Sequence, residues 1–247
     1  MNTIERLLES LKADAPVRQV LVGAFWTAVV LDTDPPRCGL ASTLRPVTHP
    51  GGPPVPQAGR LLERSGRELA EWLCSASTLE ASIGMAAFNA LLNVKVESCI
   101  EVNAEDVIIE RGAGRRVAIV GHFPFVERVR QAAGECWVLE LNPRSGDVPA
   151  VRAAEILPQA DVVALTGTSL INHTFDGLIG LCRPDAFVIL LGGSAPLTLA
   201  LFDYRVDAVA GTLVVDAPAA LRAVSQGATF RQIPGKRLLT MMREEWS

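Results

Sequence analysis

The sequence predicts an α/β protein in which a doubly wound parallel sheet follows a smaller α+β domain. Past residue 115, short apolar runs alternate with amphipathic segments, which is the pattern of consecutive βαβ units. These runs show no polar alternation, so both faces of the strands are expected to be covered. The earlier residues instead predict a helix, a hairpin and two more helices. We place the boundary in a charged segment, giving domains 1–105 and 106–247, the second of them Rossmann-like.

In the first domain, Ile4, Leu7, Leu8 and Leu11 recur at helical spacing and predict a helix over residues 3–12. The β-branched run 17–31 predicts one long strand, bent near Gly23, and residues 39–44 its hairpin partner. A Pro- and Gly-rich loop is expected over 45–59.

Two helices are expected to follow this loop. Ser65 stands three residues before Glu68, and Ser77 three before Glu80. Each pair is a capping box, in which the hydroxyl and the carboxylate bind free N–H groups at a helix start. The pattern predicts helices beginning at both serines.

The second domain is predicted to alternate five strands with five helices. The apolar runs predict strands over 116–120, 136–141, 161–166, 186–191 and 206–210. The amphipathic segments predict helices over 124–133, 150–157, 170–182, 196–202 and 218–225. Right-handed crossovers between such strands build a doubly wound sheet.

Composition excludes several classes of protein. The 247 residues carry a formal charge of −4 and no basic stripe, so we expect no nucleic-acid partner. No apolar run approaches the ~20 residues that cross a bilayer, and the N-terminus lacks a secretion pattern. We therefore expect a cytoplasmic protein without membrane contact. The 5 cysteines are scattered and form no C-x-x-C, which favours reduced core thiols, with only Cys38 in a polar setting.

Ligands of doubly wound sheets bind beyond the carboxyl ends of the strands. The loops there hold most of the Gly, Ser and Thr of this half and two histidines, so we expect the site among them. The candidate ligand-binding residues on this edge are Gly121, His122, Phe123, Glu140, Asn142, Thr166, Gly167, Thr168, Asn172, Gly193 and Ser194.

The first strand ends at Gly121, where a dinucleotide fold has three glycines in its fingerprint and this chain has one. A usual pyrophosphate approach is therefore not expected. Glu140 stands where such folds bind ribose, but it can equally be a metal ligand or a solvated strand end. His122 and His173 can meet Glu140 at the same edge, and we name these three as candidate metal ligands.

Asn89 is the candidate that the first domain contributes. It lies one turn from Asn93 on a helix face with small neighbours, which would let another element approach closely. An amide satisfied within the fold explains it as well, and the sequence leaves both interpretations open.

The order of several motifs resembles one known family. The motifs are Val120-Gly121-His122-Phe123-Pro124-Phe125, Glu140-Leu141-Asn142-Pro143, Thr166-Gly167-Thr168-Ser169-Leu170-Ile171-Asn172, Gly193-Ser194-Ala195-Pro196 and, earlier, Gly39-Leu40-Ala41-Ser42-Thr43-Leu44. The chain resembles the putative heavy-metal chelation proteins along nearly its whole length. The resemblance implies an enolase-N-terminal-like domain joined to a Rossmann-like domain, with a site between them.

Three hypotheses follow for function. The first is a protein that binds a metal ion, a metal complex or a small anionic metabolite between the domains, with a divalent or heavy metal of unspecified identity. The second is an enzyme acting on a nucleotide-like or anionic small molecule. The third is a non-catalytic partner protein, and self-association into a homodimer is expected because this fold often dimerises.

Overall fold

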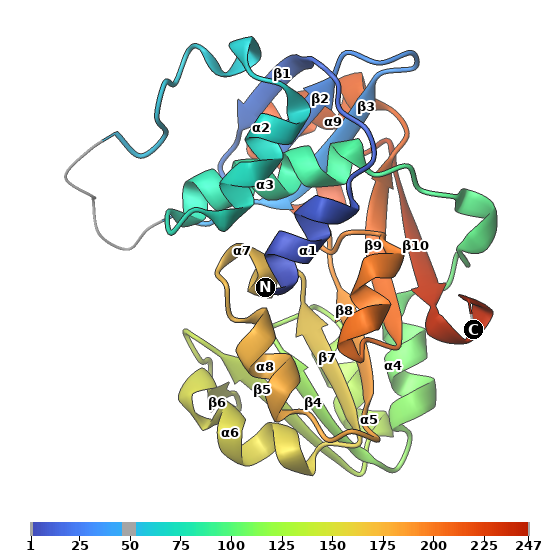
Figure 1. Ribbon diagram of the computed structural model, residues 1–247. Coiled ribbons are helices and arrows are strands. Elements are labelled where there is room, and N and C mark those ends of the chain that lie inside the picture. The colour runs from blue at the N-terminus through green and yellow to red at the C-terminus, as the bar shows by residue number, and fades with distance from the viewer. Residues whose placement is uncertain (1, 46–52, 247) are drawn as a thin grey trace.

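The computed structural model describes residues 2–45 and 53–246 of the chain and contains two sheets (Figure 1). Residues 46–52, which include His49 and part of the loop predicted over 45–59, lie outside the described residues. The N-terminal sheet has three antiparallel strands in the order β1-β2-β3, and the C-terminal sheet has seven. The α/β class and the Rossmann-like second half are confirmed.

The N-terminal sheet differs from the predicted hairpin in one respect. The run 17–31 is two strands, β1 (Val17–Val22) and β2 (Trp26–Leu31), and β3 (Arg37–Ser42) pairs with β2. The chain reverses at Gly23, whose N–H donates to the Trp26 carbonyl at 2.9 Å. A single glycine in a β-branched run gives little turn signal, which is why one bent strand was expected there.

The helices of this half begin where the apolar spacing and the two capping patterns predict. They are α1 (Thr3–Ser10), α2 (Gly66–Ala70) and α3 (Thr78–Leu91). Ser65 and Glu68 form both bonds of a capping box, whereas Ser77 only accepts the Glu80 N–H, at 3.5 Å. A capping hydroxyl therefore defines both starts.

The C-terminal sheet has the order β10-β9-β8-β7-β4-β5-β6, with all pairs parallel except β10 with β9. Numbered from β4, this is the Rossmann order 3-2-1-4-5-6 with an added antiparallel strand. The order reverses between β4 and β7, which makes that edge the expected binding crevice. The strands are β4 (Arg116–Val120), β5 (Glu135–Glu140), β6 (Val148–Pro149), β7 (Val162–Thr166), β8 (Phe187–Leu191), β9 (Ala208–Val214) and β10 (Lys236–Met242).

Three predicted helices of the second half are wrong in form. The helix expected over 150–157 is a 3-10 turn, Ala150–Arg152, followed by the short α-helix Ala153–Ile156 and a second 3-10 turn, Leu157–Gln159. The helix expected over 170–182 is broken into two by His173, which has a φ of 60°. The helix expected over 196–202 is a 3-10 helix that begins later, at Leu199. The α-helices are α4 (Ala104–Gly112), α5 (Val126–Ala132), α6 (Ala153–Ile156), α7 (Thr168–Ile171), α8 (Phe175–Leu181) and α9 (Ala217–Ser225). The 3-10 helices are Leu61–Glu63, Glu71–Cys74, Val96–Ser98, Ala150–Arg152, Leu157–Gln159, Leu199–Tyr204, Phe230–Gln232 and Arg243–Trp246.

The two halves interlock through α9. This helix follows β9 in the C-terminal half but packs on β1 and β2, beside the N-terminal sheet (Figure 1). Its Ala220 and Val224 are buried in one apolar cluster with Trp26 and Leu40. The other face of the N-terminal sheet is covered by α3, so the sheet is buried on both sides by helices from different halves of the chain.

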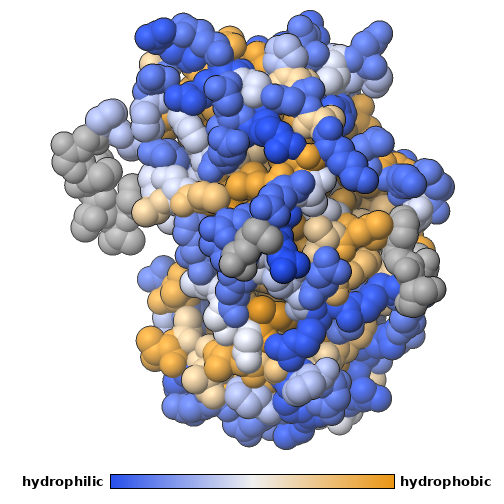
Figure 2. Space-filling model, in the orientation of Figure 1, coloured by the Kyte–Doolittle hydropathy of each residue, from blue (hydrophilic) through white to orange (hydrophobic). Residues whose placement is uncertain are grey.

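On the face shown in Figure 2, polar residues predominate over the N-terminal half, and hydrophobic residues are visible near the middle of the molecule and near β6 and α6. Beside that strand, Leu141 is 71% and Val151 is 91% exposed. In the part of the chain that the structure describes, no helix is long and apolar enough to cross a lipid bilayer.

Candidate functional site

A cavity of about 790 Å³ lies at the carboxyl edge of the C-terminal sheet. Six of the residues predicted from the sequence line it, from the loops after β4, β7 and β8: Phe123, Thr166, Gly167, Thr168, Gly193 and Ser194. The loops that the strand-end rule predicted thus form one wall of this cavity.

Gly121 brings the first two of these loops together. Its φ is +105°, a conformation that L side chains rarely adopt, and an added Cβ would lie 3.2 Å from Thr166 Cβ and 3.3 Å from the Phe123 ring. The glycine therefore turns the chain after β4 so that Phe123 can face the cavity next to Thr166.

The N-terminal half closes the cavity with Trp26 and Ser42. Ser194 Oγ accepts the Ser42 N–H at 2.9 Å and lies 3.1 Å from Ser42 Oγ, so a loop of one half is bonded to a strand of the other. Asn89, the residue predicted for this role, is not part of the cavity lining. Its Nδ2 donates to the Leu40 carbonyl at 2.9 Å and ties α3 to β3.

Two aromatic pairs form walls of the cavity. The rings of Phe123 and Phe125 stack at 5.1 Å with an angle of 8° between their planes. Trp26 and Phe230 lie 4.9 Å apart at 35°. Flat rings and aliphatic side chains such as Leu191 give the site a largely apolar surface suited to a planar organic group.

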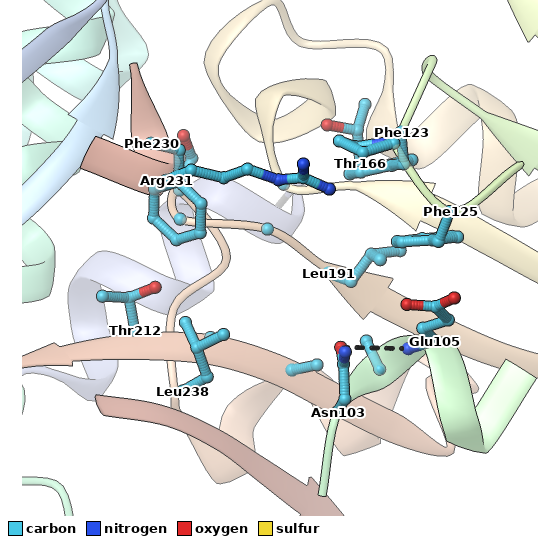
Figure 3. A pocket seen from close by; sticks show the side chains of 18 of the residues that line it. Asn103, Glu105, Phe123, Phe125, Thr166, Leu191, Thr212, Phe230, Arg231 and Leu238 are labelled. Carbon is cyan, nitrogen blue, oxygen red and sulfur yellow. Dashed lines mark hydrogen bonds between the residues drawn. The ribbon is translucent and has the colours of Figure 1, made fainter. Parts of the chain in front are cut away.

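Three cationic side chains line the cavity: Arg128, Arg231 and Lys236. Arg231 extends from the Phe230–Gln232 turn across the cavity, toward Thr166 (Figure 3). Among the described residues, no side chain forms an ion pair with its guanidinium. Lys236 lies 4.9 Å over the Phe230 ring and donates to the Ile233 carbonyl, and burial lowers its pKa. The cavity thus offers positive charge to a ligand.

Glu105, in the first turn of α4, is the acidic residue among those lining the cavity. It is 8% exposed, and its Oε1 lies 2.7 Å from Nη1 of Arg128. Its backbone N–H donates to Oδ1 of Asn103 at 3.3 Å, the helix cap drawn in Figure 3. Residues 103–115 are the charged segment in which the sequence places the domain boundary, and neither α4 nor Glu105 was predicted there. Asn103 followed by two acids is the cap signal that predicts this helix start.

Glu140, one of the predicted metal ligands, braces the loop after β4. Its Oε1 accepts the His122 N–H at 2.6 Å and its Oε2 the Leu141 N–H at 3.1 Å. The His122 ring contacts Asp147 instead, with 3.2 Å between Nδ1 and Oδ2. Burial acts to raise the Asp147 pKa, but bonds from Arg144 N–H and His122 and the charge of Arg130 hold that pKa below its usual value.

His173 lies in another part of the molecule. Its Nε2 is 2.8 Å from the Leu73 carbonyl, and it lines a separate hollow of about 270 Å³. The expected meeting of His122 and His173 is therefore not found. Asn172 uses its Oδ1 to bind Thr174, at 3.2 Å to N and 2.7 Å to Oγ1, and Asn142 is an exposed loop residue outside the cavity lining.

The site residues missed by sequence reasoning come from segments without a strand-end signal. Phe230, Arg231 and Lys236 belong to a 3-10 turn and to the antiparallel strand β10, which was not predicted. Trp26 and Ser42 belong to the other half. Their position depends on the packing between halves, which the sequence pattern does not encode.

The fold and the cavity define a class: an α/β protein with a Rossmann-like sheet whose ligand-binding edge is closed by an N-terminal antiparallel sheet. The chain belongs to the DUF364 family, described as putative heavy-metal chelation, whose model matches residues 103–243. A second model with the same description, DUF4213, matches residues 4–92.

Solved relatives share the whole fold. A DUF364 protein of unknown function from Desulfitobacterium hafniense is 25% identical, with a TM-score of 0.82 over 97% of this chain and 96% of its own. Another, from Pyrococcus horikoshii, is 19% identical, with a TM-score of 0.83 over 97% and 98%. An uncharacterized protein of Methanocaldococcus jannaschii is 26% identical over 152 residues, and the match spans 58% of each chain.

The family description implies a heavy metal, which a protein binds through several donor side chains placed close together. Within residues 2–45 and 53–246, no group of three or more His, Cys, Asp or Glu side chains is placed to hold a metal ion. Burial raises the pKa of Cys38 to about 12 and those of Cys136 and Cys182 to about 11, which disfavours the thiolate that soft metals need. The described side chains therefore do not fit direct chelation of a bare heavy-metal ion.

Proposed function

We propose that the protein binds a small anionic organic molecule in the cavity between its halves. The observation that carries this proposal is Arg231, a cation without a described ion-pair partner that extends over an aromatic surface. A guanidinium that lines the cavity without a described ion-pair partner is available to bind a carboxylate or phosphate. The cavity volume of about 790 Å³ suits a ligand of metabolite size.

This proposal also accommodates the family description. A heavy metal carried by an organic chelator arrives with its inner ligands already supplied, so the protein needs to recognise only the outer surface of the complex. Aromatic walls and a guanidinium suit a flat, anionic complex of this kind. The proposal therefore includes metal complexes as ligands and does not require a protein-derived coordination sphere.

The test uses 8-anilinonaphthalene-1-sulfonate, an aromatic anion that fluoresces in apolar surroundings. We expect saturable binding to the wild type, weakened about 10-fold or more in Arg231→Ala, because a charge-assisted contact contributes roughly 1.5–3 kcal/mol. Arg222→Ala, at an exposed arginine on α9, is the matched control and should bind like the wild type. Equal binding by all three proteins would contradict the proposal.

A metal panel tests the competing reading, direct chelation. Zinc, nickel, cobalt and iron salts are compared alone and with an aromatic chelator, following the melting temperature. We expect stabilisation by the complexes and not by the bare ions. Stabilisation by a bare ion that disappears in the double variant His122→Ala with Glu140→Ala would instead support a protein metal site. Self-association and a cytoplasmic location stay predictions of the sequence.

A further inference from the structure

Glu105 is a buried carboxylate in a cavity whose other charged groups are cations. It lies in the first turn of α4 and is 8% exposed. It is the one acid among the described residues that line the cavity. Burying an ionised carboxylate is costly unless it is paired and hydrogen-bonded. A buried acid in an otherwise apolar and basic site therefore needs an explanation.

Arg128 supplies only part of the pairing. Its Nη1 lies 2.7 Å from Glu105 Oε1 as an ion pair, and Oε1 is fully enclosed without a hydrogen-bond partner among the described residues. Arg128 is itself 64% exposed and lies 3.9 Å from Asp106 as well. Arg128 thus balances the charge of the carboxylate at the enclosed Oε1, and no described residue donates a hydrogen bond to Oε2, which is left to accept from a ligand.

The positions of the charges define opposite ends of a site. Figure 3 shows the Glu105 carboxylate below Phe125 and close to Leu191, whereas the Arg231 guanidinium lies across the open region, toward Thr166. A ligand spanning them meets an acceptor at one end and a donor at the other. Figure 3 shows Phe125 above the Glu105 carboxylate and Phe123 next to Thr166, so the stacked rings form a flat apolar wall that runs from one end of the site toward the other.

We propose that Glu105 selects a planar nitrogen heterocycle with adjacent N–H donors, and that the acidic group of the same molecule pairs with Arg231. A carboxylate oxygen has two lone pairs, so Oε2 can accept from two adjacent N–H groups, such as those on the edge of a 2-amino-4-oxo ring. This inference rests on the proposed function and names the class of molecule that the cavity takes.

The test compares probes that differ in their donor edge. Pterin-6-carboxylate and guanosine 5′-monophosphate present adjacent N–H groups and an acid, whereas adenosine 5′-monophosphate keeps the phosphate without that edge. We expect the first two to displace 8-anilinonaphthalene-1-sulfonate at concentrations about 10-fold or more below those of the adenine nucleotide. Glu105→Gln should weaken the binding of pterin-6-carboxylate and guanosine 5′-monophosphate by about 10- to 100-fold, because one charged acceptor is lost.

The controls separate this inference from the proposed function. Glu110→Gln, at an exposed acid on the same helix, should bind every probe like the wild type. The fluorescent anion should bind Glu105→Gln within about 2-fold of the wild type, since it reports Arg231 and the apolar walls.

Tight binding of all three competitors alike, or unchanged affinities in Glu105→Gln, would overturn the role of Glu105 while leaving the proposed function intact. Failure of the fluorescent anion to bind the wild type would overturn the proposed function itself. If Glu105→Gln has a lower melting temperature than the wild type, Glu105→Asp replaces it in the test, because this variant keeps the charge on a shorter side chain. Its melting point should then recover while the preference for donor-edge probes falls, and an unaltered preference would count against the inference.

Discussion

Gly39 shows how closely two elements can approach where a side chain is missing. It lies in β3 directly under α3, and an added Cβ would lie 2.1 Å from the Ala86 carbonyl oxygen and 2.4 Å from the Ala90 nitrogen. Both atoms are backbone, so neither can turn aside as a side chain would. The same close approach brings Asn89 within hydrogen-bonding reach of the Leu40 carbonyl, so the amide expected at the site instead fastens the fold.

Replacing Gly39 with alanine should therefore separate α3 from β3. We expect Gly39→Ala to lower the free energy of unfolding by about 3 kcal/mol, at the upper end for overpacking, because the clash is with backbone. Urea denaturation followed by circular dichroism measures it. Gly177→Ala is the control, since Gly177 lies in α8 with no atom near its added Cβ; it should be neutral or stabilising by up to about 1 kcal/mol. A similar loss in both variants would contradict this reading of Gly39.

At the scale of the element, a strand could be predicted from the sequence where its apolar pattern stands out from that of its neighbours. The parallel strands β4, β7 and β8 are apolar on both faces, and such runs identify buried strands. The antiparallel strand β10 starts with Lys236 and Arg237 and keeps Leu238 47% exposed, so its pattern does not stand out. The same difference applies to the site, because its strand-end loops were predicted and the wall next to β10 was not.

The start of β7 is held by an ion pair that makes stability depend on pH. Arg116 binds the Asp161 carboxylate through its side chain, at 3.0 Å, and its backbone N–H, and these bonds lower the Asp161 pKa from 3.8 to about 2. A depressed acid pKa stabilises the fold above the unfolded value and loses that contribution as pH falls through the folded one. The contribution is therefore complete above about pH 4 and absent below about pH 2.

We expect Asp161→Asn to lower the free energy of unfolding by about 1 kcal/mol at pH 7, a figure reduced for solvent screening because Arg116 is half-exposed. The difference from the wild type should shrink between pH 4 and pH 2. Denaturation curves across that range, with the exposed-site variant Glu9→Gln as control, measure it. A difference that stays constant down to pH 2 would show that the carboxylate charge is not its source.

At the scale of the whole molecule, α9 belongs to the C-terminal half of the chain but packs on the N-terminal sheet, and this packing couples the unfolding of the two halves. The N-terminal sheet is covered on one face by its own α3 and on the other by a helix nearly two hundred residues further along the chain. No periodicity in the sequence indicates that pairing, since an amphipathic helix buries its apolar face equally well on either sheet. The same packing brings Trp26 and Ser42 to the cavity, so the wall of the site that sequence patterns miss is set by it.

Interlocking predicts a single cooperative unfolding unit in place of two independent domains. Amides of β2 and β8, which lie in different sheets, should show the same free energy of opening when hydrogen exchange is followed through increasing denaturant. Val224→Ala removes buried contacts between α9 and the N-terminal sheet and should lower the free energy of opening at both strands equally, by about 2 kcal/mol. Val151→Ala, at a side chain 91% exposed, should change neither. Loss of protection in β2 alone would mean that the two sheets open separately and that α9 is docked on a domain that does not depend on it for stability.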